Sequence, residues 1–102
     1  AKGFDTFCPL GPWIENELDL SDRLITCRVN EDLRQMTSTR EMTFPIPQLI
    51  SYISSIMTLL PGDVILTGTP AGVGPLHPGD KIEISIEGLG TLKNTVCQDS
   101  HI

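Results

Sequence analysis

Two short stretches of this chain carry residues that could recognise an anionic ligand. Lys2 and Gly3 stand near one end, and residues 68–74 read Gly-Thr-Pro-Ala-Gly-Val-Gly. Because glycine has no Cβ, the backbone N–H groups beside it can approach a ligand closely, and Thr69 adds a hydroxyl. Such a loop suits a carboxylate or a phosphate, and a lysine from elsewhere in the fold would supply positive charge. A structural turn between strands is the alternative interpretation of residues 68–74.

The glycine-rich stretch does not match the common nucleotide-binding motifs. A P-loop needs a lysine followed by serine or threonine after its second glycine, and no such pair follows here. A dinucleotide-binding fingerprint opens a helix, whereas Pro75, Pro78 and Gly79 oppose one. Nucleotide binding by these two motifs is therefore excluded. A carboxylate or a phosphate ligand remains possible.

One amphipathic helix must stand upstream of the glycine-rich stretch. Its apolar residues recur at the spacing of a single helix face, and we expect them to be core: Ile46, Leu49, Ile50, Ile53, Ile56, Met57 and Leu60. Pro45 and Pro47 are tolerated only near the first turn, and Pro61-Gly62 stops the helix.

The rest of the chain reads as short strands. Residues 24–29 and 33–36 predict a hairpin, residues 82–86 alternate apolar and polar side chains, and residues 64–67 and 92–96 complete the set. Pro-Gly-Asp occurs at 61–63 and at 78–80, where it predicts type II turns. One helix and five or six strands make an α+β fold that is mainly β.

Composition limits the classes of function. The chain has 102 residues, enough for one small domain, and a net charge of −6, which disfavours nucleic-acid binding. No apolar run approaches the roughly 20 residues that cross a bilayer, so we expect no membrane partner. Cys8, Cys27 and Cys97 match neither a metal motif nor a disulfide framework, which favours a cytoplasmic protein with reduced thiols. The chain opens directly on Ala1-Lys2-Gly3 rather than on methionine, so we expect a fragment.

Three stretches together resemble the fumarylacetoacetate hydrolase family. They are residues 2–12 (Lys-Gly-Phe-Asp-Thr-Phe-Cys-Pro-Leu-Gly-Pro), residues 61–74 (Pro-Gly-Asp-Val-Ile-Leu-Thr followed by the glycine-rich stretch) and Gly79-Asp80. The resemblance covers nearly the whole chain and is greatest to the acylpyruvate hydrolase and hydroxyheptadienedioate isomerase branch. It implies that residues 1–102 are the C-terminal portion of a single catalytic domain whose upstream half is missing.

The resemblance implies a mixed β-sandwich roll, a homodimer, and Mg²⁺ or Mn²⁺ as cofactor. Its substrates would be small 2-oxo or 1,3-dioxo carboxylic acids. The reaction would pass through an enolate-like species, in C–C bond hydrolysis, tautomerisation or decarboxylation. By the family's pattern Lys2 is the catalytic residue, and Gly3 and Thr69 bind substrate. The family's carboxylate metal ligands precede its Lys-Gly motif, so no residue of this chain is assigned to metal.

Several polar residues are expected to have structural roles instead. Asp63 and Asp80 belong to the Pro-Gly-Asp turns, and His77 is a loop residue. Glu31 occupies a hairpin position at which the family favours glycine, so the turn type there is open. Two other functions remain possible: a non-catalytic remnant or assembly subunit, and a small-carboxylate binding module that uses the Thr69 loop alone.

Overall fold

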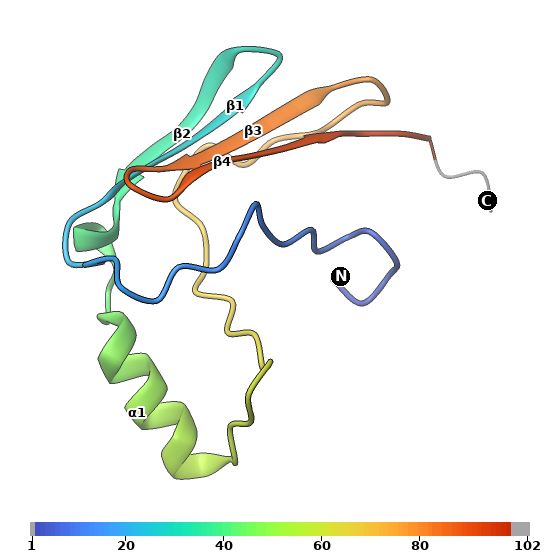
Figure 1. The fold of residues 1–102 in the computed structure, drawn as a ribbon. Helices are drawn as coiled ribbons and strands as arrows, with labels where there is room; N and C mark the ends of the chain where they lie inside the picture. Colours follow the sequence, from blue (N-terminus) through green and yellow to red (C-terminus); the bar gives the residue numbers. More distant parts are fainter. Residues whose placement is uncertain (1, 99–102) are drawn as a thin grey trace.

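The computed structural model describes residues 2–98, which form one antiparallel sheet and one α-helix (Figure 1). The strands are β1 (Leu24–Val29), β2 (Asp32–Ser38), β3 (Lys81–Ile86) and β4 (Gly90–Thr95), and their order in the sheet is β2-β1-β3-β4. A short 3₁₀ helix, η1 (Thr39–Glu41), follows β2, and α1 (Ile46–Ile56) lies beyond the end of the sheet. The predicted α+β fold with one helix is confirmed.

The β1–β2 hairpin closes through a two-residue loop. Asn30 and Glu31 have positive φ angles of 51° and 73°, as in the type I′ turn that matches the twist of paired strands. Asparagine tolerates this left-handed conformation, whereas a glutamate there is strained. Asn30 also bridges to the sheet, because its side chain donates to Asp80 Oδ1 at 2.8 Å and accepts from the Lys81 N–H at 2.9 Å.

A β-bulge interrupts β2. Cys27 pairs with Gln35 but Arg28 pairs with Leu33, so β2 carries one extra residue, Arg34, between the two pairs. Bulges leave a residue outside the regular ladder and change the direction of neighbouring groups. This bulge lies where the glycine-rich loop meets β2.

The two Pro-Gly-Asp turns form as predicted. The Asp63 N–H donates to the Leu60 carbonyl at 3.0 Å, and the Asp80 N–H donates to the His77 carbonyl at 3.0 Å. Gly62 and Gly79 both have φ of +92°, the value that the third position of a type II turn requires. Each aspartate closes its own turn, and the predicted turn roles of Asp63 and Asp80 are confirmed.

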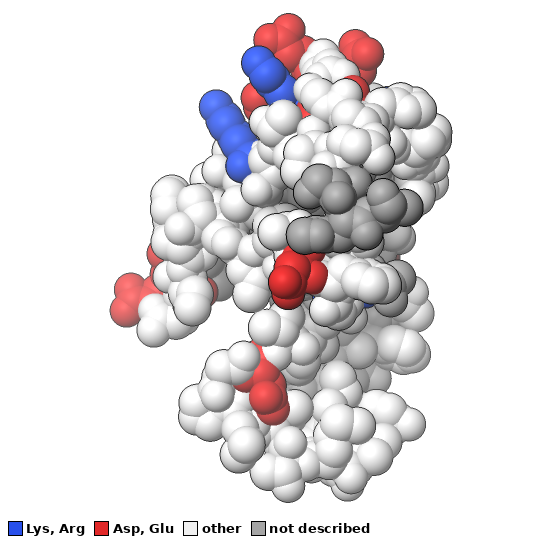
Figure 2. Space-filling model, turned by 90° about the vertical axis from the view of Figure 1, so that its right-hand side faces the viewer, with Lys and Arg blue, Asp and Glu red and all other residues white. Residues whose placement is uncertain are grey.

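Two sequence-based expectations are wrong. Residues 64–67 are not a strand, and within residues 2–98 no strand pairs with them, so Val64 and Leu66 are 55% and 56% exposed. The apolar face of α1 is not a buried core face within residues 2–98 either: Ile50 is 44% exposed and Ile56 is 61% exposed. Ile46, Leu49 and Ile53 on the same face are half-buried. Among the described hydrophobic residues only Val29 is buried, at 4%. On the face in Figure 2, residues other than Lys, Arg, Asp and Glu predominate.

The N-terminal segment packs on the turn between β3 and β4. The Trp13 ring lies so close to Gly90 that a Cβ there would come within 2.8 Å of it. Leu18 lies against Gly88 in the same way, at 2.9 Å. The segment that follows Lys2 is thus anchored beside β4, and Figure 1 shows it (blue) passing below the sheet. In the described part of the chain, no helix is long and apolar enough to cross a membrane.

Candidate carboxylate-binding site

Thr69 lines a hydroxyl-rich pocket of about 260 Å³. The pocket lies between the C-terminal end of β2, η1 and the first residues of the glycine-rich loop. Six of its lining residues carry hydroxyls: Thr37, Ser38, Thr39, Thr43, Thr67 and Thr69. Hydroxyls both donate and accept hydrogen bonds, so such groups can donate to a small carboxylate. Glu41 also lines the pocket, and its negative charge would oppose an anionic ligand unless a cation is present.

The Thr69 side chain is fixed by Gln35 of β2. Gln35 Nε2 donates to Thr69 Oγ1 at 2.8 Å and to the Pro70 carbonyl at 2.9 Å. Gln35 is half-buried, whereas Thr69 is exposed. The amide therefore ties the exposed hydroxyl to the sheet.

Gly72 lets the same loop approach β2 closely. A Cβ at this position would overlap the Arg34 carbonyl oxygen, and the residue has φ of +109°, which L-amino acids rarely adopt. The Arg34 side chain makes a longer contact with the loop, from Nη1 to the Pro75 carbonyl at 3.5 Å. The glycine at position 72 is thus required by both its conformation and its contact with the bulge.

Lys2 and Gly3 lie in the exposed N-terminal segment. Open space surrounds the position of a Cβ at Gly3. Among residues 2–98 no hydrogen bond or ion pair joins Lys2 to Thr69. The structure therefore places Thr69 in a formed pocket but does not bring Lys2 and Gly3 into contact with it.

The described residues do not fit a metal site. No group of three or more His, Cys, Asp or Glu side chains within residues 2–98 could hold a metal ion. Asp80 belongs to the second Pro-Gly-Asp turn, and its carboxylate is engaged there. The His77 N–H and the Asn30 side chain donate to its carboxylate and hold its pKa below the ordinary value.

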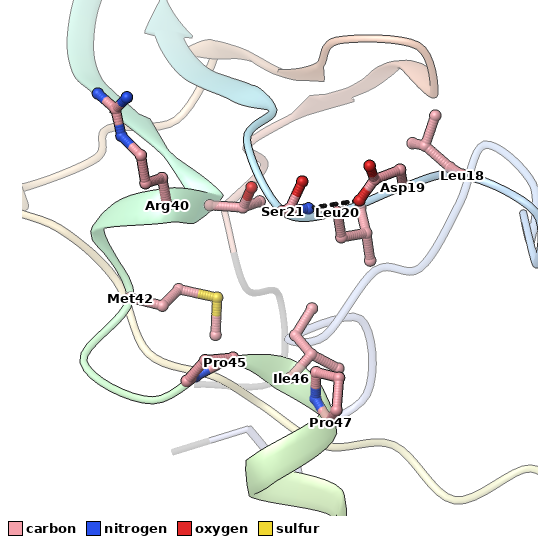
Figure 3. Close-up of a pocket in the computed structure, with 10 residues that line it drawn as sticks. Leu18, Asp19, Leu20, Ser21, Arg40, Met42, Pro45, Ile46 and Pro47 are labelled. Atoms are coloured by element: carbon pink, nitrogen blue, oxygen red, sulfur yellow. Dashed lines mark hydrogen bonds between the residues drawn. The ribbon is translucent and has the colours of Figure 1, made fainter.

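A larger hollow of about 610 Å³ adjoins the Thr69 pocket (Figure 3). Residues 18–21 form one side, and Met42, Pro45, Ile46 and Pro47 form the other. The Asp19 carboxylate accepts from the Ser21 N–H at 3.0 Å, which lowers the pKa of Asp19 and occupies it within its own turn. Thr39 and Met42 line both cavities. Nothing in residues 18–21 forms a motif, so the sequence alone does not indicate this hollow.

Gln35 was also missed by sequence analysis as a member of the site. It stands 34 residues before Thr69, in a short strand with no motif around it. The only signal that includes Gln35 is the resemblance noted above, which also covers the segment between residues 2–12 and residues 61–74.

Known proteins resemble this chain in sequence and structure. It superposes on 5-carboxymethyl-2-hydroxymuconate delta-isomerase from Mycobacterium smegmatis with a TM-score of 0.94 and 53% identity, over 98% of this chain and 40% of that one. Maleylpyruvate hydrolase from Sphingobium sp. SYK-6, solved in complex with manganese(II) ion and pyruvate, gives a TM-score of 0.90 and 45% identity, over 95% and 38% of the two chains.

A curated relative is also similar to this chain in sequence. The mitochondrial oxaloacetate tautomerase of Oryza sativa subsp. japonica is 53% identical over 91 residues, which are 87% of this chain and 40% of the relative. The chain thus spans less than half the length of each of these proteins. The family described as fumarylacetoacetate (FAA) hydrolase C-terminal matches residues 1–97. The chain belongs to the fumarylacetoacetate hydrolase family and corresponds to its C-terminal part.

Proposed function

We propose that the whole protein is an enzyme acting on small 2-oxo or 1,3-dioxo carboxylic acids through an enolate-like intermediate. The reaction is C–C bond hydrolysis, tautomerisation or decarboxylation. The observation that carries the proposal is the hydroxyl-rich pocket lined by Thr69, whose Oγ1 accepts a hydrogen bond from Gln35 Nε2 at 2.8 Å. It is supported by the similar proteins named above, which are an isomerase, a hydrolase and a tautomerase.

In this proposal Thr69 donates a hydrogen bond to the substrate carboxylate, and the Gly3 N–H adds a second donor. Lys2 stabilises the oxyanion that develops as the enolate forms, because a preorganised ammonium acts most strongly where charge appears in the transition state. Lys2 is exposed on the segment that Trp13 anchors to Gly90. Lys2 is not among the residues that line the Thr69 pocket, so its role here is taken from the family's pattern.

The assembly that we propose is a cytoplasmic homodimer using Mg²⁺ or Mn²⁺. Manganese in complex with the Sphingobium hydrolase supports a divalent ion, whose ligands would come from outside the described residues. A bound ion of this kind would act as a Lewis acid on a 2-oxo acid. The residues of this chain would bind and orient the carboxylate and would hold the balancing positive charge.

The test is an activity panel on the whole protein with Mg²⁺ or Mn²⁺, covering acylpyruvates, oxaloacetate and hydroxymuconate-type acids. Thr69→Val should raise KM about ten- to hundredfold, because a hydrogen bond to a charged group contributes about 1.5–3 kcal/mol. Thr95→Val is the matched control, since Thr95 is an exposed residue of β4. No turnover of any acid in the panel, by folded protein with metal present, would contradict the proposal.

A non-enzymatic carboxylate-binding module is the second candidate. One observation favours it: residues of this chain line the Thr69 pocket, and six of them carry hydroxyls. Pyruvate binding that is unchanged by removal of divalent ions, together with absence of turnover, would decide for the module.

A further inference from the structure

The hydrogen bonds at Thr69 define which partner donates. The Pro70 carbonyl can only accept, and it lies 2.9 Å from one terminal atom of Gln35. That atom must therefore be the amide nitrogen rather than the amide oxygen. The same nitrogen lies 2.8 Å from Thr69 Oγ1, so its second hydrogen is directed at the hydroxyl. Thr69 accepts this bond, and its own proton is free to point elsewhere.

We infer that Gln35 is a positioning residue that presents Thr69 as a hydrogen-bond donor to the ligand carboxylate. This inference rests on the proposed function of Thr69. A threonine hydroxyl without a fixed partner rotates and can donate a hydrogen bond to a nearby carbonyl. The Gln35 amide occupies one acceptor direction of Oγ1 and one lone pair of the Pro70 carbonyl, which disfavours a bond from the hydroxyl to that carbonyl and leaves its proton for the pocket.

The backbone supports this arrangement. Gln35 directly follows Arg34, the extra residue of the bulge in β2, and Gly72 lies against the Arg34 carbonyl. The loop is therefore held at two places: by side-chain hydrogen bonds at Thr69 and Pro70, and by close backbone contact at Gly72. Gly72 permits this close approach, and the contact from Arg34 Nη1 to the Pro75 carbonyl at 3.5 Å does not involve the Gln35 amide, so the amide's effect on Thr69 can be tested separately.

Two substitutions distinguish the polarity of the bond from simple packing. Gln35→Met keeps the length of the side chain and removes both donors. Gln35→Glu keeps the shape and replaces the amide donors by carboxylate acceptors, so the Thr69 hydroxyl would donate to Glu rather than to the ligand. A carboxylate at this place would also repel an anionic ligand. Gln48→Met, on the exposed surface of α1, is the matched control for the change of residue type.

The experiment measures the dissociation constant of pyruvate for the whole protein by titration calorimetry with Mg²⁺ present, and the unfolding temperature of each variant. Gln35→Met should weaken pyruvate binding about three- to tenfold, the range for loss of one ordinary hydrogen bond. Gln35→Glu should weaken it further. In a Thr69→Val background Gln35→Met should have no additional effect, because Gln35 acts through the hydroxyl.

The outcomes separate the inference from the function on which it rests. If Thr69→Val weakens pyruvate binding but Gln35→Met has no effect, or has the same effect in both backgrounds, the inference is overturned and the proposed function stands. If Thr69→Val itself leaves binding unchanged, both the role of Thr69 and the inference are overturned. If Gln35→Met weakens binding and its unfolding temperature also falls by a large amount, the inference is overturned in favour of a structural role for Gln35.

Discussion

Replacing Gly72 by alanine tests how closely the glycine-rich loop must approach β2. An alanine at this position would have to adopt φ of +109°, and its Cβ would overlap the Arg34 carbonyl oxygen. A left-handed conformation costs an L-residue about 1–2 kcal/mol. The loop must then move from β2, which removes the two Gln35 hydrogen bonds to Thr69 and Pro70, each contributing about 1 kcal/mol. Reduced freedom of the unfolded chain returns about 0.4–1 kcal/mol. We expect a net loss of about 3 kcal/mol.

The matched control is Gly62→Ala. Gly62 has a similar φ of +92° but no atom within 4 Å of the place where a Cβ would stand. Its substitution should therefore carry only the conformational term, a net loss of about 1 kcal/mol. Denaturant unfolding of the whole protein gives both values, and pyruvate binding should weaken only in Gly72→Ala. Equal loss of stability in the two variants would show that the close contact with Arg34 has no energetic importance, and the reasoning would fail.

Three further predictions concern other parts of the chain. Glu31→Gly should stabilise the whole protein by about 0.5–1 kcal/mol in denaturant unfolding, because glycine relieves the positive φ of 73° in the hairpin loop; no change would mean that the turn rearranges. Asp80 has a lowered pKa, so the stability that it contributes is present above about pH 4 and is lost as the pH falls through the lowered value. Asp80→Asn should therefore be less stable at pH 7 and should lose less stability on acidification, and an acid limb identical to that of the parent protein would contradict this. Lys2→Met should lower kcat by about 10²–10³ with a smaller change in KM in steady-state kinetics; near-normal kcat with metal bound would remove Lys2 from the mechanism.

The sequence predicted best those elements that depend on local chemistry. Both Pro-Gly-Asp turns form because proline presets φ and glycine supplies the positive φ at the next position. The hairpin of β1 and β2 forms around Asn30-Glu31, and β3 and β4 lie where alternation and Gly88 place them. The start of α1 near Pro45 and Pro47 also follows from local rules.

The end of the helix and the partners of the apolar segments were not predictable in the same way. The helix stops at Ile56 rather than near Leu60. Within its last turns Ser54 Oγ donates to the Ser51 carbonyl and Ser55 Oγ to the Tyr52 carbonyl, which competes with the backbone ladder.

An apolar run such as residues 64–67 indicates that a segment prefers burial, but it does not identify what covers it. The same holds for the stripe of α1, of which Ile56 is 61% exposed. The candidate site likewise has one part that was predictable from local sequence and one part that was not. Thr69 belongs to a local motif, whereas its contact with Gln35 depends on a pairing of distant segments and on a bulge that no sequence pattern marked.

The contact between Trp13 and Gly90 also makes the chain optically informative. Trp13 is the only tryptophan of the chain, it is 57% exposed, and its ring rests on a residue without a side chain. Indole emission shifts to longer wavelength and is quenched more readily when the ring leaves a protein surface for water. Fluorescence of this single residue therefore reports whether the segment carrying Lys2 is docked on β4. A ligand that releases Trp13 from Gly90 would therefore be detected in real time, without a label and independently of turnover.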